Sequence, residues 1–162
     1  MRFRSFLGRW VFSVSSGLLA LASLLGCRAL GPSLPRANLQ EPGWTVREGQ
    51  AVWHLPQSTV ELAGEVLVAT RADGRAFVQF TRTPFPLVSG QTTRKLWEVD
   101  FPPEQRHYSG WGTPPERIIW LYLPRTLTTR PLPKNWSWHE DKNGWKLENR
   151  TKKEFLEGCF NQ

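Results

Sequence analysis

The sequence has little of the chemistry on which most metal, haem and disulfide-stabilised proteins depend. It holds two cysteines, three histidines and one methionine among 162 residues. No Cys-x-x-Cys pair, zinc-ligand spacing or haem-attachment pattern is present, which excludes those sites and a disulfide framework. His54, His107 and His139 are scattered along the chain and fit structural or surface roles. A three-histidine metal site assembled in space is the alternative, and no cofactor is predicted.

Motifs of the common enzyme classes are also missing. There is no glycine-rich phosphate loop, and Ser89-Gly90 lacks the flanking glycine of a nucleophile elbow. Acidic residues do recur on or near the expected strands, where alternation often brings two carboxylates to one cleft by coincidence. These are Glu61, Glu65, Glu98, Asp100 and Glu104. The sequence therefore predicts a protein that is not an enzyme, with a hydrolase using Glu98, Asp100 and Glu104 as the alternative.

The chain also lacks an apolar run long enough to span a membrane. Its longest mostly apolar stretch, residues 10–25, is shorter than the roughly 20 residues that a membrane-spanning helix needs. Arg2, Arg4 and Arg9 precede this stretch, and Gly26-Cys27 follows it. A positive head, a short apolar region and a small residue form the layout of a secretory signal.

The end of this segment, Leu24-Leu25-Gly26-Cys27, resembles the lipobox of bacterial lipoproteins. The resemblance implies that a diacylglycerol is attached to the Cys27 thiol and that cleavage precedes this residue. The new amino terminus is then acylated, for example with palmitate. Leu25 is larger than the residue the family usually has there. An uncleaved signal anchor and an ordinary signal peptide with a chance cysteine are the alternatives.

The lipobox divides the chain into three parts. Residues 1–26 are the expected signal peptide, residues 27–43 the lipidated cysteine with a tether rich in proline and glycine, and residues 44–162 one globular domain. Arg28 is not the aspartate that retains some lipoproteins in the inner membrane. We therefore expect the protein at the periplasmic face of the outer membrane, with the inner membrane as the alternative.

Cys159, left without an intramolecular partner, is interpreted as a small hydrophobic residue rather than a redox group.

Charge excludes a further class of partner. Removing residues 1–26 removes three arginines and no acids, so Lys+Arg falls from 21 to 18 against 14 Asp+Glu, and the formal net charge falls from +7 to +4. No dense stripe of lysine and arginine remains, so a nucleic-acid partner is not predicted. The oligomeric state expected is a monomer.

The rest of the chain predicts mostly antiparallel strands. Apolar and β-branched runs are separated by turn signals, of which Asp73-Gly74 and residues 141–144 are the clearest. The expected strands cover residues 52–55, 59–70, 75–82, 87–93, 96–101, 135–139, 145–149 and 155–160. The fold class that follows is mainly β, as a curved antiparallel sheet or incomplete β-barrel with one or two short helices.

The expected helix begins at Thr113. Thr113 can cap the first turn, Pro114 fits that turn, and Glu116 stands where a capping box requires it. The apolar residues 118–123 follow, and Pro124 is the expected stop. Because this run is apolar on nearly all sides, a buried strand is the alternative.

Short strands, an apolar helix and a tryptophan-rich final meander, over residues 44–160, resemble the unclosed half-barrel of the lipoprotein-sorting carrier and its outer-membrane receptor. That resemblance implies a concave face that holds acyl chains. The predicted function is therefore the binding of a lipid or lipid-linked hydrophobic ligand by an envelope lipoprotein. Candidate ligand-binding residues are Trp53, Phe77, Trp97, Tyr108, Trp111 and Trp120.

A second function class uses the same aromatic residues differently. Exposed tryptophans, together with a binding loop at residues 101–112, could grip a glycan or an envelope protein. Two further alternatives give these residues a structural role only. In one, residues 101–112 are a connection that packs over the core, and in the other the tryptophans fill an ordinary closed core. A deep apolar cavity would favour lipid, whereas a flat exposed aromatic strip would favour glycan or protein.

Overall fold

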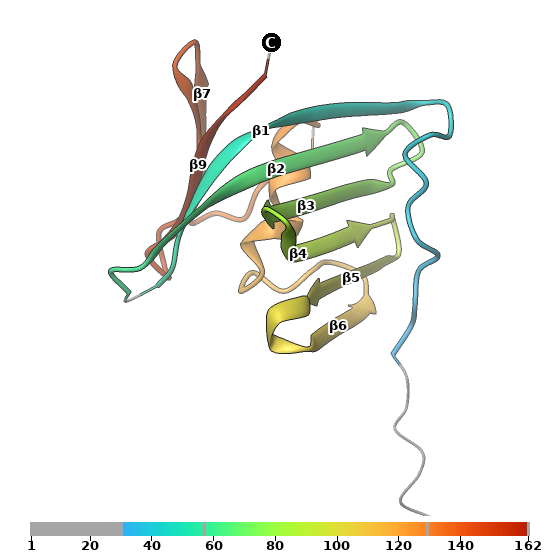
Figure 1. Cartoon of the computed structure of the whole chain (residues 1–162). Helices are drawn as coiled ribbons and strands as arrows, with labels where there is room; N and C mark the ends of the chain where they lie inside the picture. The colour runs from blue at the N-terminus through green and yellow to red at the C-terminus, as the bar shows by residue number, and fades with distance from the viewer. Residues whose placement is uncertain (1–30, 57, 129, 162) are drawn as a thin grey trace, which may run out of the picture. The chain divides into compact units, whose positions relative to one another are not determined.

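The computed structural model describes residues 31–56, 58–128 and 130–161. Residues Gly31–Gln162 form one compact unit, built on a single antiparallel sheet (Figure 1). The expected lipidation site, Cys27, lies outside the described residues. The strands are β1 (Trp44–His54), β2 (Glu61–Arg71), β3 (Ala76–Arg82), β4 (Phe85–Thr92), β5 (Leu96–Phe101), β6 (Arg106–Trp111), β7 (Trp136–Asp141), β8 (Gly144–Asn149) and β9 (Glu154–Phe160).

The sheet order is β6-β5-β4-β3-β2-β1-β9-β8-β7, so the last three strands join the sheet beside β1. The helical elements are short: the 3₁₀ helices η1 (Pro102–Glu104) and η2 (Ile119–Leu121), and the α-helix α2 (Leu123–Thr126). The predicted fold class is confirmed: the sheet is curled and unclosed, it is antiparallel throughout, and its helices are short.

The close approach of strands near the centre of the sheet depends on glycine. Ala51 of β1 pairs with Gly64 of β2 on one side and with Gly158 of β9 on the other. A Cβ atom added at Gly158 would overlap the carbonyl oxygen of Gln50, and one added at Gly64 would overlap that of Thr81. Glycine in a strand often marks such a close backbone approach, where the sheet bends.

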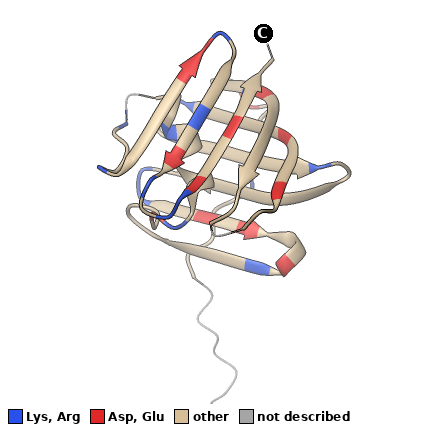
Figure 2. Ribbon diagram, turned by 90° about the vertical axis from the view of Figure 1, so that its left-hand side faces the viewer, with Lys and Arg blue, Asp and Glu red and all other residues tan. Residues whose placement is uncertain are grey.

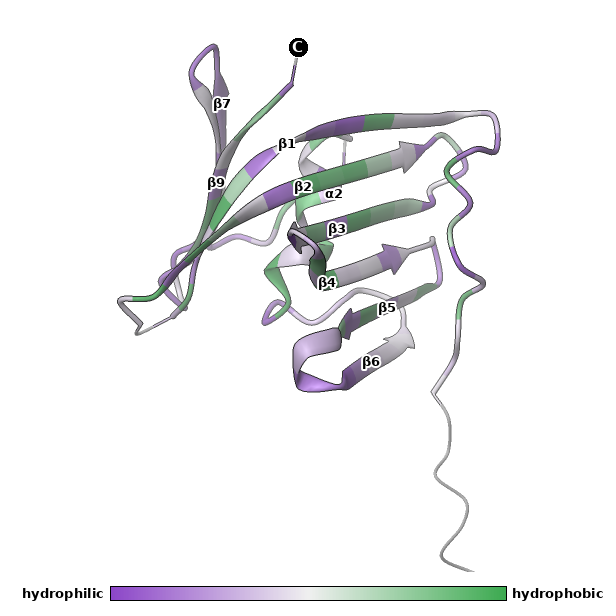
Figure 3. Ribbon diagram, viewed as in Figure 1, coloured by the Kyte–Doolittle hydropathy of each residue, from purple (hydrophilic) through white to green (hydrophobic). Residues whose placement is uncertain are grey.

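The inner face of the curled sheet holds the core, and the chain's own residues 118–123 fill it. Trp120, Tyr122, Ile119, Leu121 and Leu123 are all at most 1% exposed. They pack against strand residues that recur with the period of two expected for one sheet face. These include Val66, Val68, Val78, Phe80, Val88 and Val99. Figure 3 shows the hydrophobic residues of β2 and β3 with α2 behind them.

The helix predicted to run from Thr113 to Pro124 is wrong in position. Residues 113–117 are not helical, η2 begins at Ile119, and Pro124 lies in the first turn of α2 rather than at its end. The physical reason is the Pro114-Pro115 pair, because a residue before proline is pushed out of the α region. Proline also fits the first helical turn, where no backbone donor is needed.

The interpretation of residues 101–112 as a loop is also wrong. Residues 102–104 form η1, and residues 106–111 form the edge strand β6, which pairs with β5 from Phe101–Arg106 to Leu96–Trp111. The two prolines tighten the connection into a 3₁₀ turn, so the aromatic residues that follow return along β5. By contrast, the turns predicted at Asp73-Gly74 and residues 141–144 are confirmed.

Residues 31–43 lie against the outer face of the sheet, which we define as the face opposite residues 118–123. The backbone N–H of Leu34 donates to Glu98 Oε2 at 2.8 Å. The side chain of Gln91 donates to the Pro35 carbonyl at 3.2 Å and to Glu98 Oε1. Glu98 is 8% exposed, so this segment is held by a buried carboxylate from β5.

Candidate binding surfaces

The six candidate ligand-binding residues occupy three different environments. Trp97 and Trp120 are 7% and 1% exposed and belong to the core, where Trp120 stacks on Phe80 with ring centroids 4.6 Å apart. Trp53 is half-buried and meets Trp120 edge-on at 5.5 Å. The structure therefore brings Trp53, Trp97 and Trp120 into one hydrophobic cluster, against which Tyr108 also packs.

The other three candidates lie on strands β3 and β6, and two of them, Phe77 and Trp111, lie outside that cluster. Phe77 is half-buried on the outer face of β3. It alternates with Val78 and Phe80, which are buried in the core. Tyr108 is half-buried on β6 and lies edge-on to Phe101 at 6.2 Å. Trp111, at the end of β6, is 69% exposed. Only Trp111 of the six therefore presents an open aromatic surface.

A buried carboxyl group lies beside the aromatic cluster. Glu154 of β9 is 5% exposed, and its Oε1 accepts a hydrogen bond from Trp53 Nε1 at 3.0 Å. Burial raises the pKa of Glu154, while the Trp53 hydrogen bond and the charge of Lys152 oppose that rise. This pair could not be predicted from the sequence, because Glu154 follows a turn and resembles an exposed residue.

An open groove of about 770 Å³ is lined by outer-face residues of β1, β2 and β9, the end of β3, and the β7–β8 hairpin. We call it the outer groove. Its lining combines carboxylates, other polar side chains and short apolar ones. Those used below are Glu65, Asp141, Glu157, Arg82, Lys146 and Cys159. A concavity of this size falls within the range of ligand sites.

Further acidic residues lie on the same face as the outer groove. Glu48, Glu61 and Glu148 share the outer face with Glu65 and Glu157, since each alternates with an inward residue of its strand. Figure 2 shows the recurrence of Asp and Glu along these strands. The backbone N–H of Asn143 donates to Asp141 at 2.7 Å, and this hydrogen bond lowers the pKa of that carboxyl group.

The carboxylates weighed as a hydrolytic pair are engaged separately. Glu98 accepts a hydrogen bond from the backbone N–H of Leu34, Asp100 Oδ1 lies 2.7 Å from His107 Nδ1, and Glu104 lies 3.0 Å from Arg106. Ser89 pairs with Asp100, which in turn pairs with His107. Asp100 therefore stands between Ser89 and His107, whereas a nucleophilic relay needs the histidine in the middle.

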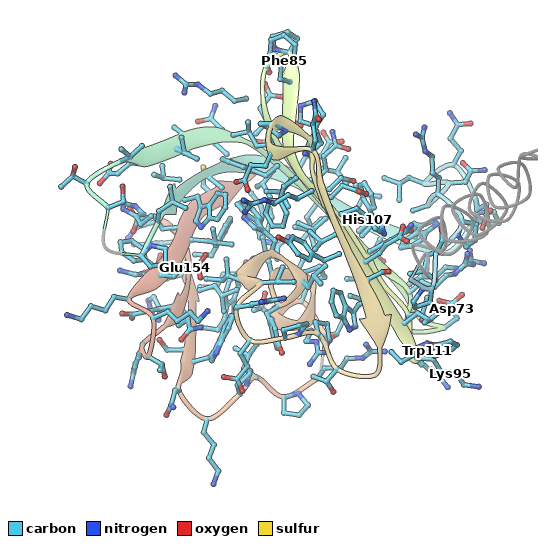
Figure 4. The ribbon with its side chains drawn as sticks, turned by 90° about the horizontal axis from the view of Figure 1, so that it is seen from below. Asp73, Phe85, Lys95, His107, Trp111 and Glu154 are labelled. Carbon is cyan, nitrogen blue, oxygen red and sulfur yellow. The ribbon has the colours of Figure 1, made fainter. Side chains whose placement is uncertain are left out.

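Two exposed aromatic residues lie far apart on the described unit. Trp111 is 69% exposed and Phe85, in the β3–β4 hairpin, is 70% exposed. Figure 4 shows Phe85 far from Trp111, which lies beside Lys95. The backbone N–H of Gly112 donates to the Lys95 carbonyl at 2.7 Å, which fixes the proximity of Lys95 and Trp111.

No protein-family model matches the chain, and no curated protein matches its sequence. Within the described residues, no group of three His, Cys, Asp or Glu side chains is arranged to hold a metal ion. None of the helices in that part of the chain has the length and apolar character to cross a membrane.

Proposed function

We propose that the chain is a lipoprotein of the bacterial cell envelope, anchored through Cys27 at the periplasmic face of the outer membrane. The support is the lipobox Leu24-Leu25-Gly26-Cys27 after a positive head and a short apolar stretch. The compact unit begins at Gly31, and a chain of four residues reaches at most about 14 Å when extended. Such an anchor would keep the folded domain at the membrane surface.

Membrane fractionation tests the anchor. Cys27→Ala should move the protein out of the membrane fraction, and the matched variant Cys159→Ala should leave it there. Wild-type and Cys27→Ala chains that fractionate alike would overturn the anchor. Mass spectrometry of the mature amino terminus, carrying diacylglycerol and a further acyl chain, is an independent readout.

The folded domain, in this proposal, is a non-enzymatic interaction module that binds another envelope protein in the outer groove. The carrying observation is that residues 118–123 fill the inner face of the sheet, so the space available to a ligand is outside. Glu65, Asp141 and Glu157 line the groove, and three more glutamates lie beside it, against Arg82 and Lys146. This charge distribution favours a positively charged polypeptide segment as the occupant.

Cys159 offers a probe for this binding, because its exposed thiol lines the outer groove. A photo-crosslinker on Cys159, activated in native envelope membranes, should give a defined protein adduct. Glu65→Lys should abolish the adduct by reversing a groove charge, and Glu104→Lys, on η1 away from the groove, should not. An adduct that persists in Glu65→Lys, or is absent from the wild type, would argue against the groove.

Lipid binding is the second candidate function, and the observation that favours it is that the curled sheet is unclosed. The apolar residues 118–123, however, occupy the place that an acyl chain would take on the inner face of the sheet. A lipid would therefore have to displace Trp120 and its neighbours. Native mass spectrometry of the protein purified without its anchor decides between the two. Co-purifying phospholipid or fatty acid would favour the lipid function, and a mass without ligand would favour surface binding.

A further inference from the structure

A small pocket at one end of the sheet is lined by an unusual number of arginines. It has a volume of about 290 Å³ and lies where the β2–β3 turn, the β4–β5 turn, α2, Thr128 and Arg130 meet. We call it the arginine pocket, after its five arginines. They are Arg71, Arg75, Arg94, Arg125 and Arg130.

Only two of these arginines are neutralised by carboxylates. Arg71 lies 2.8 Å from Glu41 and 3.4 Å from Asp73, and Arg75 lies 2.9 Å from Asp73 and 3.6 Å from Glu41. The other three arginines of the pocket form no ion pair with any described residue. Five arginines thus line a hollow with two carboxylates beside it, which concentrates positive charge there.

Arg125 is the most constrained of the three unpaired arginines. Its Cζ lies 4.7 Å from the centre of the Tyr122 ring, and its Nε is buried with no hydrogen-bond partner among the described residues. Burial lowers the pKa of Arg125, and the nearby charge of Arg130 lowers it further, against the opposing effect of Tyr122. A buried guanidinium donor without an acceptor is costly, and an oxyanion would supply the acceptor.

The β2–β3 turn holds the other two arginines together. Arg130 Nη2 donates to the Gly74 carbonyl at 3.2 Å. Gly74 has a φ of 92°, and a Cβ atom added there would lie 2.6 Å from Arg130 Nη2 and 2.9 Å from Arg94 Cγ. Glycine at this turn therefore lets Arg94 and Arg130 approach the same backbone position from two different elements.

We propose that the arginine pocket binds a phosphate group carried as a monoester or a diester. The planar guanidinium group offers paired donors that match phosphate oxygens, and its charge persists at any physiological pH. Lys95 and the exposed Trp111 lie at the same end of the molecule (Figure 4). A phospholipid headgroup and a free phosphate compound share the chemistry that this pocket recognises. The proposal rests on neither the anchor nor the outer groove.

The test is a titration of the full chain, purified in a neutral detergent, at constant ionic strength. Inorganic phosphate and glycerophosphoglycerol, a deacylated phospholipid headgroup, are the two probes, followed by calorimetry and by ³¹P line broadening. The double variant Arg94→Gln/Arg130→Gln should weaken binding at least about tenfold, since each removes a charge-assisted hydrogen bond. Arg106→Gln, an exposed arginine on β6 outside the pocket, is the matched control.

Each outcome has one meaning. Tighter binding of glycerophosphoglycerol than of inorganic phosphate, lost in the double variant, supports the site and identifies a headgroup diester. Tighter binding of inorganic phosphate, equally lost, supports the site and identifies a free phosphate compound. No saturable binding of either probe, or binding that survives in the double variant, overturns the proposal. The double variant could lose binding because it fails to fold, so circular dichroism checks its folding. The single variant Arg94→Gln, at an exposed position, repeats the test without that risk.

Discussion

The protonation of Glu154 is coupled to folding. Its carboxyl group is buried beside Trp53, and burial raises its pKa above the usual value of 4.5. The folded chain therefore keeps a proton at pH values where the unfolded chain has lost it. The free energy of unfolding must then fall as the pH rises from about 4.5 through the folded-state pKa, and it stays reduced above that.

Glu154→Gln removes this cost while keeping an oxygen that can accept the Trp53 hydrogen bond. We expect the variant to exceed the wild type in free energy of unfolding at neutral pH by on the order of 1 kcal/mol, the scale of a buried polar group. The difference should vanish below pH 4.5, where the carboxyl group is protonated in both states. Urea unfolding across a pH series measures both quantities.

Glu148→Gln serves as the control for that series. Glu148 lies on the neighbouring strand β8, on the opposite face, and is half-buried. Its substitution should not reproduce the pH dependence of Glu154→Gln. A stability difference between Glu154→Gln and the wild type that is constant from acid to neutral pH would contradict the role given to burial.

Among elements, residues 118–126 contribute most to the core. The short η2 and α2 could not persist alone, because isolated helices need about 12–15 residues. They form because their side chains fill the inner face of the sheet. Trp120 contacts two strands of the sheet: it stacks on Phe80 of β3 and meets Trp53 of β1 edge-on.

Trp120→Ala should lower the free energy of unfolding by about 3–5 kcal/mol, the usual cost of removing a large buried aromatic residue. Trp111→Ala removes an equally large side chain that is 69% exposed, and its effect should stay within about 0.5 kcal/mol. Urea unfolding followed by circular dichroism compares the two. Equal losses in both variants would mean that Trp120 does not form the centre of the core.

The elements that the sequence predicted well have both a turn signal and an alternating pattern. The β2–β3 hairpin has Asp73-Gly74 between two alternating runs, and the β7–β8 hairpin has residues 141–144 between tryptophan-bearing runs. The edge strand β6 has no apolar face to reveal it, since all six of its residues are exposed or half-buried. Residues 118–123 are apolar on every side, so the sequence shows no alternation of apolar and polar residues from which a helix could be distinguished from a strand.

The binding surfaces were harder to predict, and for a different reason. The outer groove and the arginine pocket each draw residues from at least three elements that are distant in sequence. Arg71, Arg94 and Arg125 are separated by more than twenty residues each and belong to no motif. The aromatic candidates could be named from the sequence, but which of them fill the core depends on the position of residues 118–123.

For the whole described unit, charge is separated between two surfaces. The arginine pocket and Lys95 form a basic end, and the outer face of β1, β2, β8 and β9 carries most of the glutamates described above (Figure 2). Anionic lipid attracts basic groups over about a Debye length, roughly 8–10 Å at physiological salt. Trp111 at the basic end is suited to the interface of a membrane, where tryptophan is enriched.

If the chain is anchored as proposed, this separation should orient the domain with its basic end toward an anionic membrane and the outer groove away from it. In a Cys159→Ala background, which removes the exposed native thiol, a polarity-sensitive fluorophore on Lys95→Cys should then report a less polar environment in phosphatidylglycerol vesicles than in phosphatidylcholine vesicles. The same label on Asn143→Cys, in the exposed β7–β8 turn beside the groove, should report water in both. High salt should reduce the Lys95→Cys response, because exposed charges are screened. Equal responses at the two sites, or a Lys95→Cys response unaffected by salt and lipid charge, would show that charge does not orient the domain.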